Sequence, residues 1–334
     1  MDLSSHLQLL KAQPLWLLLL SFFGLFYILK LSFSFILWFY LIFLRPAKNL
    51  RRYGSWAIVT GCTEGISKSF SFQLARKRPN LVLVARNPDK LAAVSNEILA
   101  KYRKVQIKTM IIDFSGDLDD GIKRLLKTID GLDVGILVNN AGISYPYAKY
   151  FHEVDEELVK SLIKVNVEAV TRVTHALLPG MLEKKCGAIV NIGSGAATVL
   201  PSEPLYAVYA GTKAYIDEFS KSLHVEYKNK GIDVQCQLPL YVATRMASIK
   251  RASFFAPSSD TYARSSVAWI GLGSSCTPYW PHSVQWCFVA MLPESVVNKW
   301  RLGFCLNIRK EVCSRSQTKK SPLIYIVQDI YLVQ

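Results

Sequence analysis

The chain has 334 residues, 51% of them hydrophobic, and carries a formal net charge of +15. This length accommodates one membrane anchor, one domain of typical Rossmann size and a tail. Basic residues do not alternate with aromatic ones and no zinc pattern is present, so we expect no nucleic-acid partner. The seven cysteines form no C-x-x-C pair and the five histidines show no ligand spacing, so we expect neither a disulfide framework nor a metal site.

The first predicted element is a membrane-spanning segment over residues 15–44, whose only charge is Lys30. Thirty residues at about 1.5 Å each exceed a hydrocarbon core of about 30 Å. Lys30 makes membrane insertion less favourable by roughly 2.5–3.5 kcal/mol, whereas each large apolar residue makes it more favourable by about 0.3–0.6 kcal/mol. The many apolar residues outweigh the lysine, so insertion is favoured. A cleaved signal peptide is disfavoured because the apolar run is too long and no small-x-small cleavage site precedes the basic cluster.

Basic residues follow this span more densely than they precede it. Only Lys11 and the N-terminus lie before it, whereas a cluster lies behind it: Arg45, Lys48, Arg51 and Arg52. The positive-inside rule therefore predicts that the domain behind the span faces the cytosol. Lys30 leaves open a hairpin of two segments, which would place the N-terminus in the cytosol as well.

A nucleotide-binding pattern begins the domain. Trp56–Thr60 has the character of a short buried strand and leads into a glycine-rich turn, Gly61–Ser67. A helix with apolar residues at Ile66, Phe70 and Leu74 follows, and a second strand is predicted over residues 81–84. A strand, a tight turn and a helix N-terminus together predict a cradle for a pyrophosphate.

The residue after the second strand indicates which dinucleotide binds. NAD sites usually have a carboxylate there for the ribose 2′-hydroxyl, but this chain has Arg86. A guanidinium attracts a 2′-phosphate, so we predict NADPH; the alternative is a solvated arginine after a strand. Asn87 and Pro88 then predict the cap and first turn of the next helix.

Four further apolar runs continue the α/β alternation and predict strands over residues 105–112, 134–138, 188–192 and 232–238. Polar residues follow at their ends: Asp113, Asn139 to Gly142, Ser194 and Pro239. Short apolar strands separated by segments of helical length predict a Rossmann-type, doubly wound parallel sheet. Ligands bind at the carboxyl ends of such strands.

Tyr209 and Lys213 are four residues apart in a helix-compatible segment. Their side chains then project from one helical face. A nearby ammonium favours phenolate, so we expect a lowered Tyr209 pKa and a general acid for carbonyl reduction.

These motifs together resemble the short-chain dehydrogenase/reductase family. The resemblance rests on Thr60-Gly61-x-x-x-Gly65, Asn139-Asn140-Ala141-Gly142, Asn166, Ser194 and Tyr209-x-x-x-Lys213, in that order. The leader, the run from Leu44 to Ala57, the phrase from Asn139 to Pro146 and the run from Cys276 to His282 are similar to one subfamily. It comprises the microsomal very-long-chain 3-oxoacyl-CoA reductases, related to membrane-bound 17β-hydroxysteroid dehydrogenases.

The resemblance implies a role for each matching residue. Tyr209 would protonate the carbonyl oxygen, Lys213 would hold the nicotinamide ribose and depress the Tyr209 pKa, and Ser194 would bind and orient the substrate oxygen. Asn166 would bind a water that connects Lys213 to solvent. The implied cofactor-binding residues are Gly61, Thr63, Glu64, Gly65, Ile66, Arg86, Asp113, Asn140, Ala141, Gly142, Tyr209, Lys213 and Thr244.

Three positions depart from the family pattern. Ser67 replaces the third glycine of the turn, which puts cofactor affinity in doubt. Ser194 lies 15 residues before Tyr209, farther than usual, with Ser202 as a rival. Leu240 replaces a glycine after Pro239 and cannot adopt positive φ cheaply, so we expect that loop to follow another path.

We therefore divide the chain into a membrane anchor (1–48), an NADP-binding reductase domain (49–250) and a substrate lid or membrane-associated segment with a basic tail (251–334). Residues 285–292 are too short to span a bilayer but suit one lying on its surface. Lys319-Lys320 resembles a di-lysine retrieval signal, yet 14 residues follow it, so we expect it to be inactive.

The resemblance implies NADPH-dependent reduction of 3-oxoacyl-CoA during very-long-chain fatty acid elongation. Acyl-CoA, membrane lipid and elongase subunits would be the partners, and the endoplasmic reticulum membrane the location. A 17β-hydroxysteroid dehydrogenase is the nearest alternative. A weakly active paralogue that serves as an elongase scaffold is another, motivated by Ser67 and Leu240.

Overall fold

The computed structural model describes residues 13–77, 79–247 and 249–318 and forms two compact units, Met1–Ala47 and Lys48–Gln334. The expectations for Lys11, Lys319 and Lys320 lie outside the described residues. In the first unit, helix α2 (Leu15–Phe39) continues into the π-helical turn η1 (Tyr40–Leu44), and none of these residues is buried. This continuous helix of 30 residues matches the predicted span and is long and apolar enough to cross a membrane.

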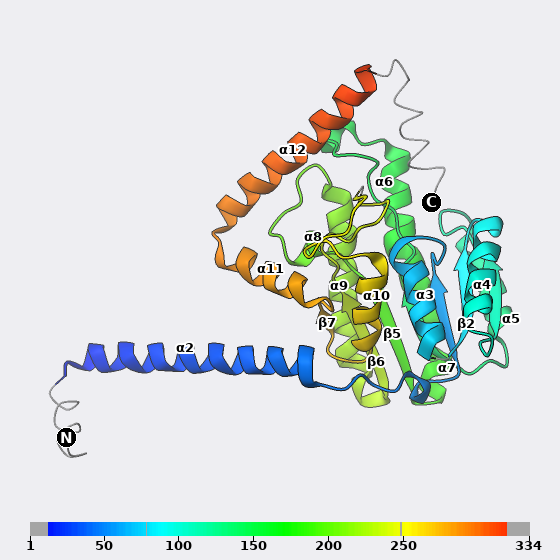
Figure 1. Cartoon of the computed structure of the whole chain (residues 1–334), viewed down its shortest axis with the longest axis horizontal. Helices are drawn as coiled ribbons and strands as arrows, with labels where there is room; N and C mark the ends of the chain where they lie inside the picture. Colours follow the sequence, from blue (N-terminus) through cyan, green and yellow to red (C-terminus); the bar gives the residue numbers. More distant parts are fainter. Residues whose placement is uncertain (1–12, 78, 248, 319–334) are drawn as a thin grey trace. The chain divides into compact units, whose positions relative to one another are not determined.

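The second unit is built on a seven-stranded parallel sheet in the order β3-β2-β1-β4-β5-β6-β7, which confirms the predicted fold class (Figure 1). The strands are β1 (Trp56–Thr60), β2 (Asn80–Ala85), β3 (Ile107–Ile111), β4 (Val134–Asn139), β5 (Gly187–Ile192), β6 (Ile232–Gln237) and β7 (Ser275–Cys276). The strand order reverses between β1 and β4, where doubly wound sheets bind their ligands. The sequence did not predict β7, and β3 starts later than predicted because Val105 is held in a turn by Tyr102.

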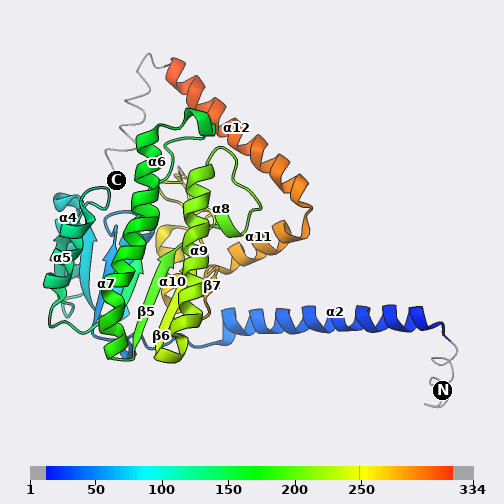
Figure 2. The ribbon, with the colours of Figure 1, turned by 180° about the vertical axis from the view of Figure 1, so that it is seen from behind.

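Helices cover both faces of the sheet. Figure 1 shows α3 (Gly65–Lys77) and α10 (Ser259–Ala268) in front of it, with α4 (Pro88–Lys101) beside them. Figure 2 shows α7 (Ala169–Glu183) and α9 (Ala207–Tyr227) on the other face, with α5 (Leu118–Ile129). The remaining elements are η2 (Leu50–Arg52), η3 (Phe151–Glu153), α6 (Glu156–Ile163), η4 (Lys164–Glu168), α8 (Gly195–Thr198), η5 (Lys228–Lys230), α11 (Trp280–Met291) and α12 (Glu294–Thr318).

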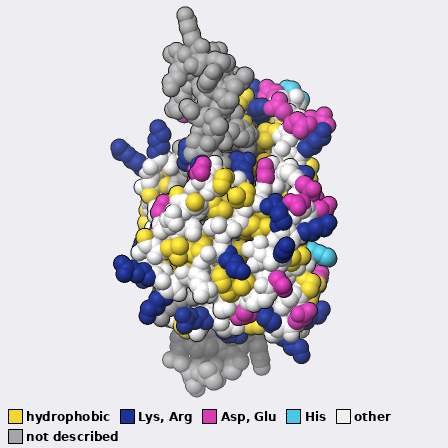
Figure 3. Space-filling model, turned by 90° about the vertical axis from the view of Figure 1, so that its right-hand side faces the viewer, with side chains coloured by type: hydrophobic (Ala, Val, Ile, Leu, Met, Phe, Trp, Pro, Cys, Tyr) yellow, Lys and Arg dark blue, Asp and Glu magenta, His cyan; other side chains and the backbone are white. Residues whose placement is uncertain are grey.

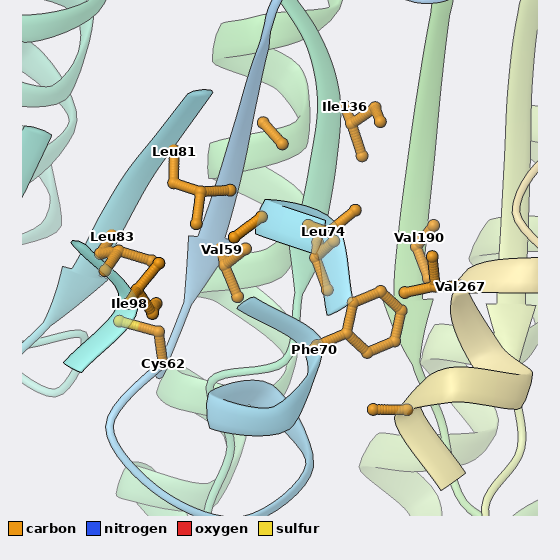
Figure 4. Close-up of a cluster of buried hydrophobic side chains, with 14 of the residues drawn as sticks. Val59, Cys62, Phe70, Leu74, Leu81, Leu83, Ile98, Ile136, Val190 and Val267 are labelled. Atoms are coloured by element: carbon orange, nitrogen blue, oxygen red, sulfur yellow. The ribbon is translucent and has the colours of Figure 1, made fainter. Parts of the chain in front are cut away.

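The core on the α3 side packs one apolar helix face against the strands. Phe70 and Leu74 of α3 lie between Val59 of β1, Val190 of β5 and Val267 of α10 (Figure 4). All five side chains are buried. This packing fixes α3, and with it the glycine-rich turn at its N-terminus, against the centre of the sheet.

The segment that enters the domain from the N-terminal side is fastened to it before β1 begins. The Tyr53 hydroxyl donates to Asp233 Oδ2 at 2.5 Å, and Lys48 Nζ lies 2.9 Å from the same oxygen. A Cβ placed on Gly135 would lie 2.2 Å from the Tyr53 carbonyl, so the segment lies directly on the glycine backbone. Leu50 is buried in the core as well. The domain therefore incorporates the chain from Lys48 onward.

Candidate active site

The glycine-rich turn and the end of β4 are in close contact. Gly61 has φ +66°, and a Cβ on it would lie 2.8 Å from Ala141 Cα, so only glycine fits. The Thr60 hydroxyl accepts hydrogen bonds from the amides of Asn140 and Ala141, each at 3.1 Å. The glycine-rich turn and the segment after β4, both predicted to bind the cofactor, are thus joined by the Thr60 hydroxyl and by backbone contact.

Ser67 is accommodated inside the turn. Its side chain is fully buried, and its hydroxyl donates to the carbonyl oxygens of Gly61 and, at 3.0 Å, Glu64. A hydroxyl that bonds two turn carbonyls stabilises the turn. The serine that replaces the usual glycine therefore bonds the turn from within.

A cavity of about 700 Å³ runs from this turn to Tyr209 and Lys213. Every residue predicted to bind the cofactor lines it. Arg86 and Asp113 lie along it at the ends of β2 and β3. Burial raises the pKa of Asp113, but hydrogen bonds from Ser115 and the charge of Arg86 outweigh burial and lower it overall. With the α3 N-terminus at the turn, these residues fit a dinucleotide.

Tyr209 lies on α9, close to Ser194, which follows β5 by two residues and caps α8. The expected lowering of the Tyr209 pKa is wrong. Burial raises that pKa, the neighbouring Ser194 opposes the rise, and Glu203 and Tyr241 add to it. Lys213 does not counter the effect of burial on the Tyr209 pKa, because its ammonium donates to the Ile192 carbonyl.

Lys213 is buried, and its Nζ donates to the Ile192 carbonyl at 2.9 Å. Burial lowers the pKa of Lys213 to about 8. Its Nζ is 5.9 Å from the centroid of the Tyr209 ring, so the two side chains share one helix face as predicted.

Asn166 lies in the π-helical turn η4, a distortion frequent at functional sites. Its Oδ1 accepts from the Ile143 amide at 2.8 Å, and its Nδ2 donates to the Ile143 carbonyl at 2.9 Å and to Thr212 Oγ1 at 3.1 Å. The side chain thus fixes the loop after β4 to α9. A Cβ on Gly142 would lie 3.2 Å from Asn166 Oδ1 and 3.6 Å from Lys213 Nζ, so both residues face that loop.

The rival serine is engaged elsewhere. Ser202 Oγ donates to Asn298 Oδ1 of α12 at 2.5 Å, whereas the Ser194 hydroxyl lies near enough to Tyr209 to oppose the rise of its pKa. The extra residues between Ser194 and Tyr209 form α8 and a loop that contacts α12. This geometry favours Ser194 as the residue that orients the substrate.

A buried charged cluster next to this loop was not predicted. Arg301 of α12 is 2% exposed and pairs with Glu203, whose side chain is 7% exposed. The two terminal guanidinium nitrogens lie 3.3 and 3.4 Å from the Tyr241 hydroxyl. Because the three residues are far apart in sequence, no local pattern could have indicated their contact.

The loop after β6 follows a path without positive φ at Leu240, as expected. His282 of α11 holds it, since its Nδ1 accepts from the Leu240 amide at 3.3 Å and its Nε2 donates to the Tyr241 carbonyl at 3.2 Å. Burial lowers the pKa of His282 to about 4, which keeps the ring neutral for this role. A Cβ on Gly195 would lie 2.2 Å from Leu240 Cδ2, so Leu240 fills the space that glycine leaves.

The cavity also has a wall that the sequence did not predict. It comes from the loop after β4, the start of α6 and the loop after β6: Pro146, Tyr147, Lys149, Leu158, Arg245 and Met246. Lys149 Nζ is 2.9 Å from Asp155. Apart from Pro146, which ends the run from Asn139, these residues belong to none of the motifs found in the sequence.

A Rossmann-type sheet with a dinucleotide cradle and a Ser–Tyr–Lys cluster defines an oxidoreductase. The family model described as short chain dehydrogenase matches residues 55–253. The chain belongs to that family.

Several relatives carry more specific names. A very-long-chain 3-oxoacyl-CoA reductase-like protein of Arabidopsis thaliana is 49% identical over 309 residues, covering 90% of this chain and 97% of its own. The very-long-chain 3-oxoacyl-CoA reductase of Rattus norvegicus is 41% identical, covering 81% and 85%. A human relative named inactive hydroxysteroid dehydrogenase-like protein 1 is 38% identical, covering 80% and 81%.

Among solved structures, a short-chain dehydrogenase from Sphingobium yanoikuyae in complex with NADPH is similar, with a TM-score of 0.58 and 26% identity. The match covers 64% of this chain and 83% of that one.

Proposed function

We propose that the protein is an NADPH-dependent reductase that converts 3-oxoacyl-CoA to 3-hydroxyacyl-CoA in very-long-chain fatty acid elongation. The observation that carries the proposal is the cavity that joins the glycine-rich turn to Tyr209 and the buried Lys213, with Ser194 near enough to Tyr209 to influence its pKa. The names of the Arabidopsis and rat relatives support the substrate class.

In this proposal NADPH supplies the hydride when it is bound. The turn from Gly61 to Ile66 would hold its pyrophosphate, Arg86 its 2′-phosphate, and Lys213 its nicotinamide ribose. Ser194 orients the 3-oxo oxygen, and Tyr209 gives its proton to that oxygen as the carbonyl carbon is reduced. A raised Tyr209 pKa keeps the proton on the phenol until the reaction needs it.

We also propose that the helix over residues 15–44 anchors the protein in the endoplasmic reticulum membrane, with the domain in the cytosol. The basic cluster behind the helix supports this orientation. Residues 251–318 would form the substrate lid and membrane-associated segment. Elongase subunits would be the partners that supply the substrate and take up the product.

The first alternative is a 17β-hydroxysteroid dehydrogenase with the same catalytic residues. The second is a weakly active scaffold, which the name of the human inactive relative keeps open. The described site argues against the scaffold, because Ser67 completes the turn and Ser194, Tyr209 and Lys213 are brought together.

The test is NADPH oxidation by membranes that contain the protein, with a 3-oxoacyl-CoA or estrone as substrate and Tyr209→Phe as control. Oxidation that needs the acyl-CoA and is lost in the variant supports the proposal. NADPH oxidation with estrone but not with the acyl-CoA would assign the steroid function. If neither substrate supports NADPH oxidation, the result favours the scaffold. The Phe variant should still quench intrinsic fluorescence on NADPH addition.

The cofactor is tested separately with Arg86→Ala. Loss of a guanidinium that binds the 2′-phosphate should weaken NADPH binding by roughly ten- to a hundredfold and leave NADH binding unchanged. Tighter binding of NADH than of NADPH by the wild-type protein would contradict the assignment.

A further inference from the structure

Helices α11 and α12 meet at an exposed, apolar apex. The chain from Cys287 to Val296 is exposed at every residue except the half-buried Val289, and Glu294 is its only charge. We define the apex face as Phe288, Met291 and Leu292 with Val296, Trp300 and Phe304 of α12. Figures 1 and 2 show the junction of the two helices standing away from the sheet.

Helix α12 exposes large apolar side chains next to the apex. Asn298, Arg301 and Arg309 face the domain beside the buried Val297 and Cys305, with distances of 2.5 Å from Asn298 to Ser202 and 2.7 Å from Arg309 to Glu153. Val296, Trp300 and Phe304, at spacings of four residues, lie on the side left exposed. A helix in contact with water normally presents polar side chains on its exposed side.

The exposed apolar residues of α12 lie in the half of the helix next to the apex. Beyond Phe304, the exposed positions among those described are Asn307, Lys310, Glu311 and Ser314. The exposed apolar residues therefore form a local patch at the apex instead of a stripe along the helix. By contrast, Figure 3 shows a face on which acidic and basic side chains are interspersed among the hydrophobic ones.

The apolar environment that this patch fits is a lipid surface. Three residues, 45–47, connect the apolar helix to Lys48, which is bonded to Asp233. Three residues reach about 10 Å at most, so a bilayer that holds the helix also lies within reach of the domain. Trp300 is 56% exposed and adjoins the exposed Lys299, a pairing typical of the membrane interface.

We propose that the apex face of α11 and α12 docks into the lipid surface to which the N-terminal helix anchors the protein. The proposal rests on the proposed membrane anchor but not on the substrate.

The native Cys287 is an exposed probe within the apex. The full chain is placed in phosphatidylcholine/phosphatidylserine nanodiscs and labelled with a charged maleimide, and labelling at each site is followed by peptide mapping. A cysteine at Val225, a residue of α9 that is 78% exposed, serves as the matched site away from the apex. We expect Cys287 to react at least about tenfold more slowly than Val225→Cys.

The double variant Phe288→Glu/Met291→Glu should release Cys287 and restore rapid labelling. Both side chains are exposed, so the folded domain tolerates the change, and an unchanged melting temperature confirms it. Labelling of Cys287 that is faster than in the wild-type chain reports undocking of the apex face.

Rapid labelling of Cys287 in the wild-type chain would overturn the proposal. So would protection that appears only when a long-chain acyl-CoA is added, because the substrate would then cover the face. Extraction with alkaline carbonate separates failure of the docking proposal from failure of the proposed membrane anchor. If the protein resists extraction but Cys287 is labelled rapidly, only the docking proposal is refuted. If the protein is extracted, the membrane anchor is refuted.

Discussion

Arg301→Met tests the buried charged cluster that joins α12 to the loop before Tyr209. The substitution keeps most of the side-chain volume but leaves the Glu203 carboxylate, 7% exposed, without its cation. Breaking a buried pair in this way costs about 3–5 kcal/mol. At roughly 2–4 °C per kcal/mol for a domain of this size, the melting temperature should fall by roughly 6 °C or more.

The assay is thermal unfolding of the full chain in nanodiscs, with Arg264→Met as control. Arg264 pairs with Asp260 at 3.0 Å, but both side chains are more than half exposed, so its loss should cost less than about 1 kcal/mol. The double variant Arg301→Met/Glu203→Gln should recover part of the lost stability, because it removes the unpaired charge.

Acidification distinguishes an unpaired charge from a simple packing defect. Burial raises the pKa of Glu203, and Arg301 opposes that rise. Without Arg301 the pKa rises further, so the folded state takes up a proton at a higher pH than the unfolded state. The destabilisation should therefore be fully present well above that pKa and shrink as the pH falls. A loss that is independent of pH, or one no larger than the loss in Arg264→Met, would refute the reasoning.

Three further variants test other parts of the site. Ser67→Ala should cost about 1 kcal/mol in urea unfolding, since two turn carbonyls lose their donor; no loss would mean that the hydroxyl is not needed. Gly195→Ala should reduce the free energy of unfolding by about 1–3 kcal/mol, because the added methyl group overpacks against Leu240. In a Leu240→Ala background the same substitution should cost much less, and an equal cost in both backgrounds would exclude the contact between residues 195 and 240. Lys213 has a pKa of about 8 in the folded state and an ordinary value of 10.5. Between pH 8 and 10.5, its amine is therefore protonated in the unfolded state and largely neutral in the folded state. Wild-type stability relative to Lys213→Met should therefore rise with pH in urea unfolding at pH 7 and 9.5, and a flat difference would contradict the burial of the ammonium.

The sheet could be predicted because its central strands are buried on both faces and therefore appear as continuous apolar runs. β1 and β4, at the centre, follow this pattern most clearly. The two-residue strand β7 is too short to produce a pattern. Local spacing likewise sufficed for Tyr209 and Lys213, which lie one helical turn apart.

The Tyr209 pKa could not be predicted from spacing, because the burial of both side chains decides it and burial is a tertiary property. The pairing of Arg301 with Glu203 joins residues 98 positions apart. His282 could have been noticed, since it ends a run that resembles the subfamily, but its contacts with Leu240 and Tyr241 exist only in the folded chain.

The attachment of residues 48–53 determines where a soluble fragment of this protein can begin. A fragment that starts at the first strand, near Trp56, would lack Leu50, and Asp233 would lose both its cation, Lys48, and the hydrogen bond from the Tyr53 hydroxyl. It would also uncover the Gly135 backbone. Expression boundaries for crystallisation should therefore be placed at or before Lys48, because the eight residues ahead of Trp56 belong to the folded domain and not to the tether.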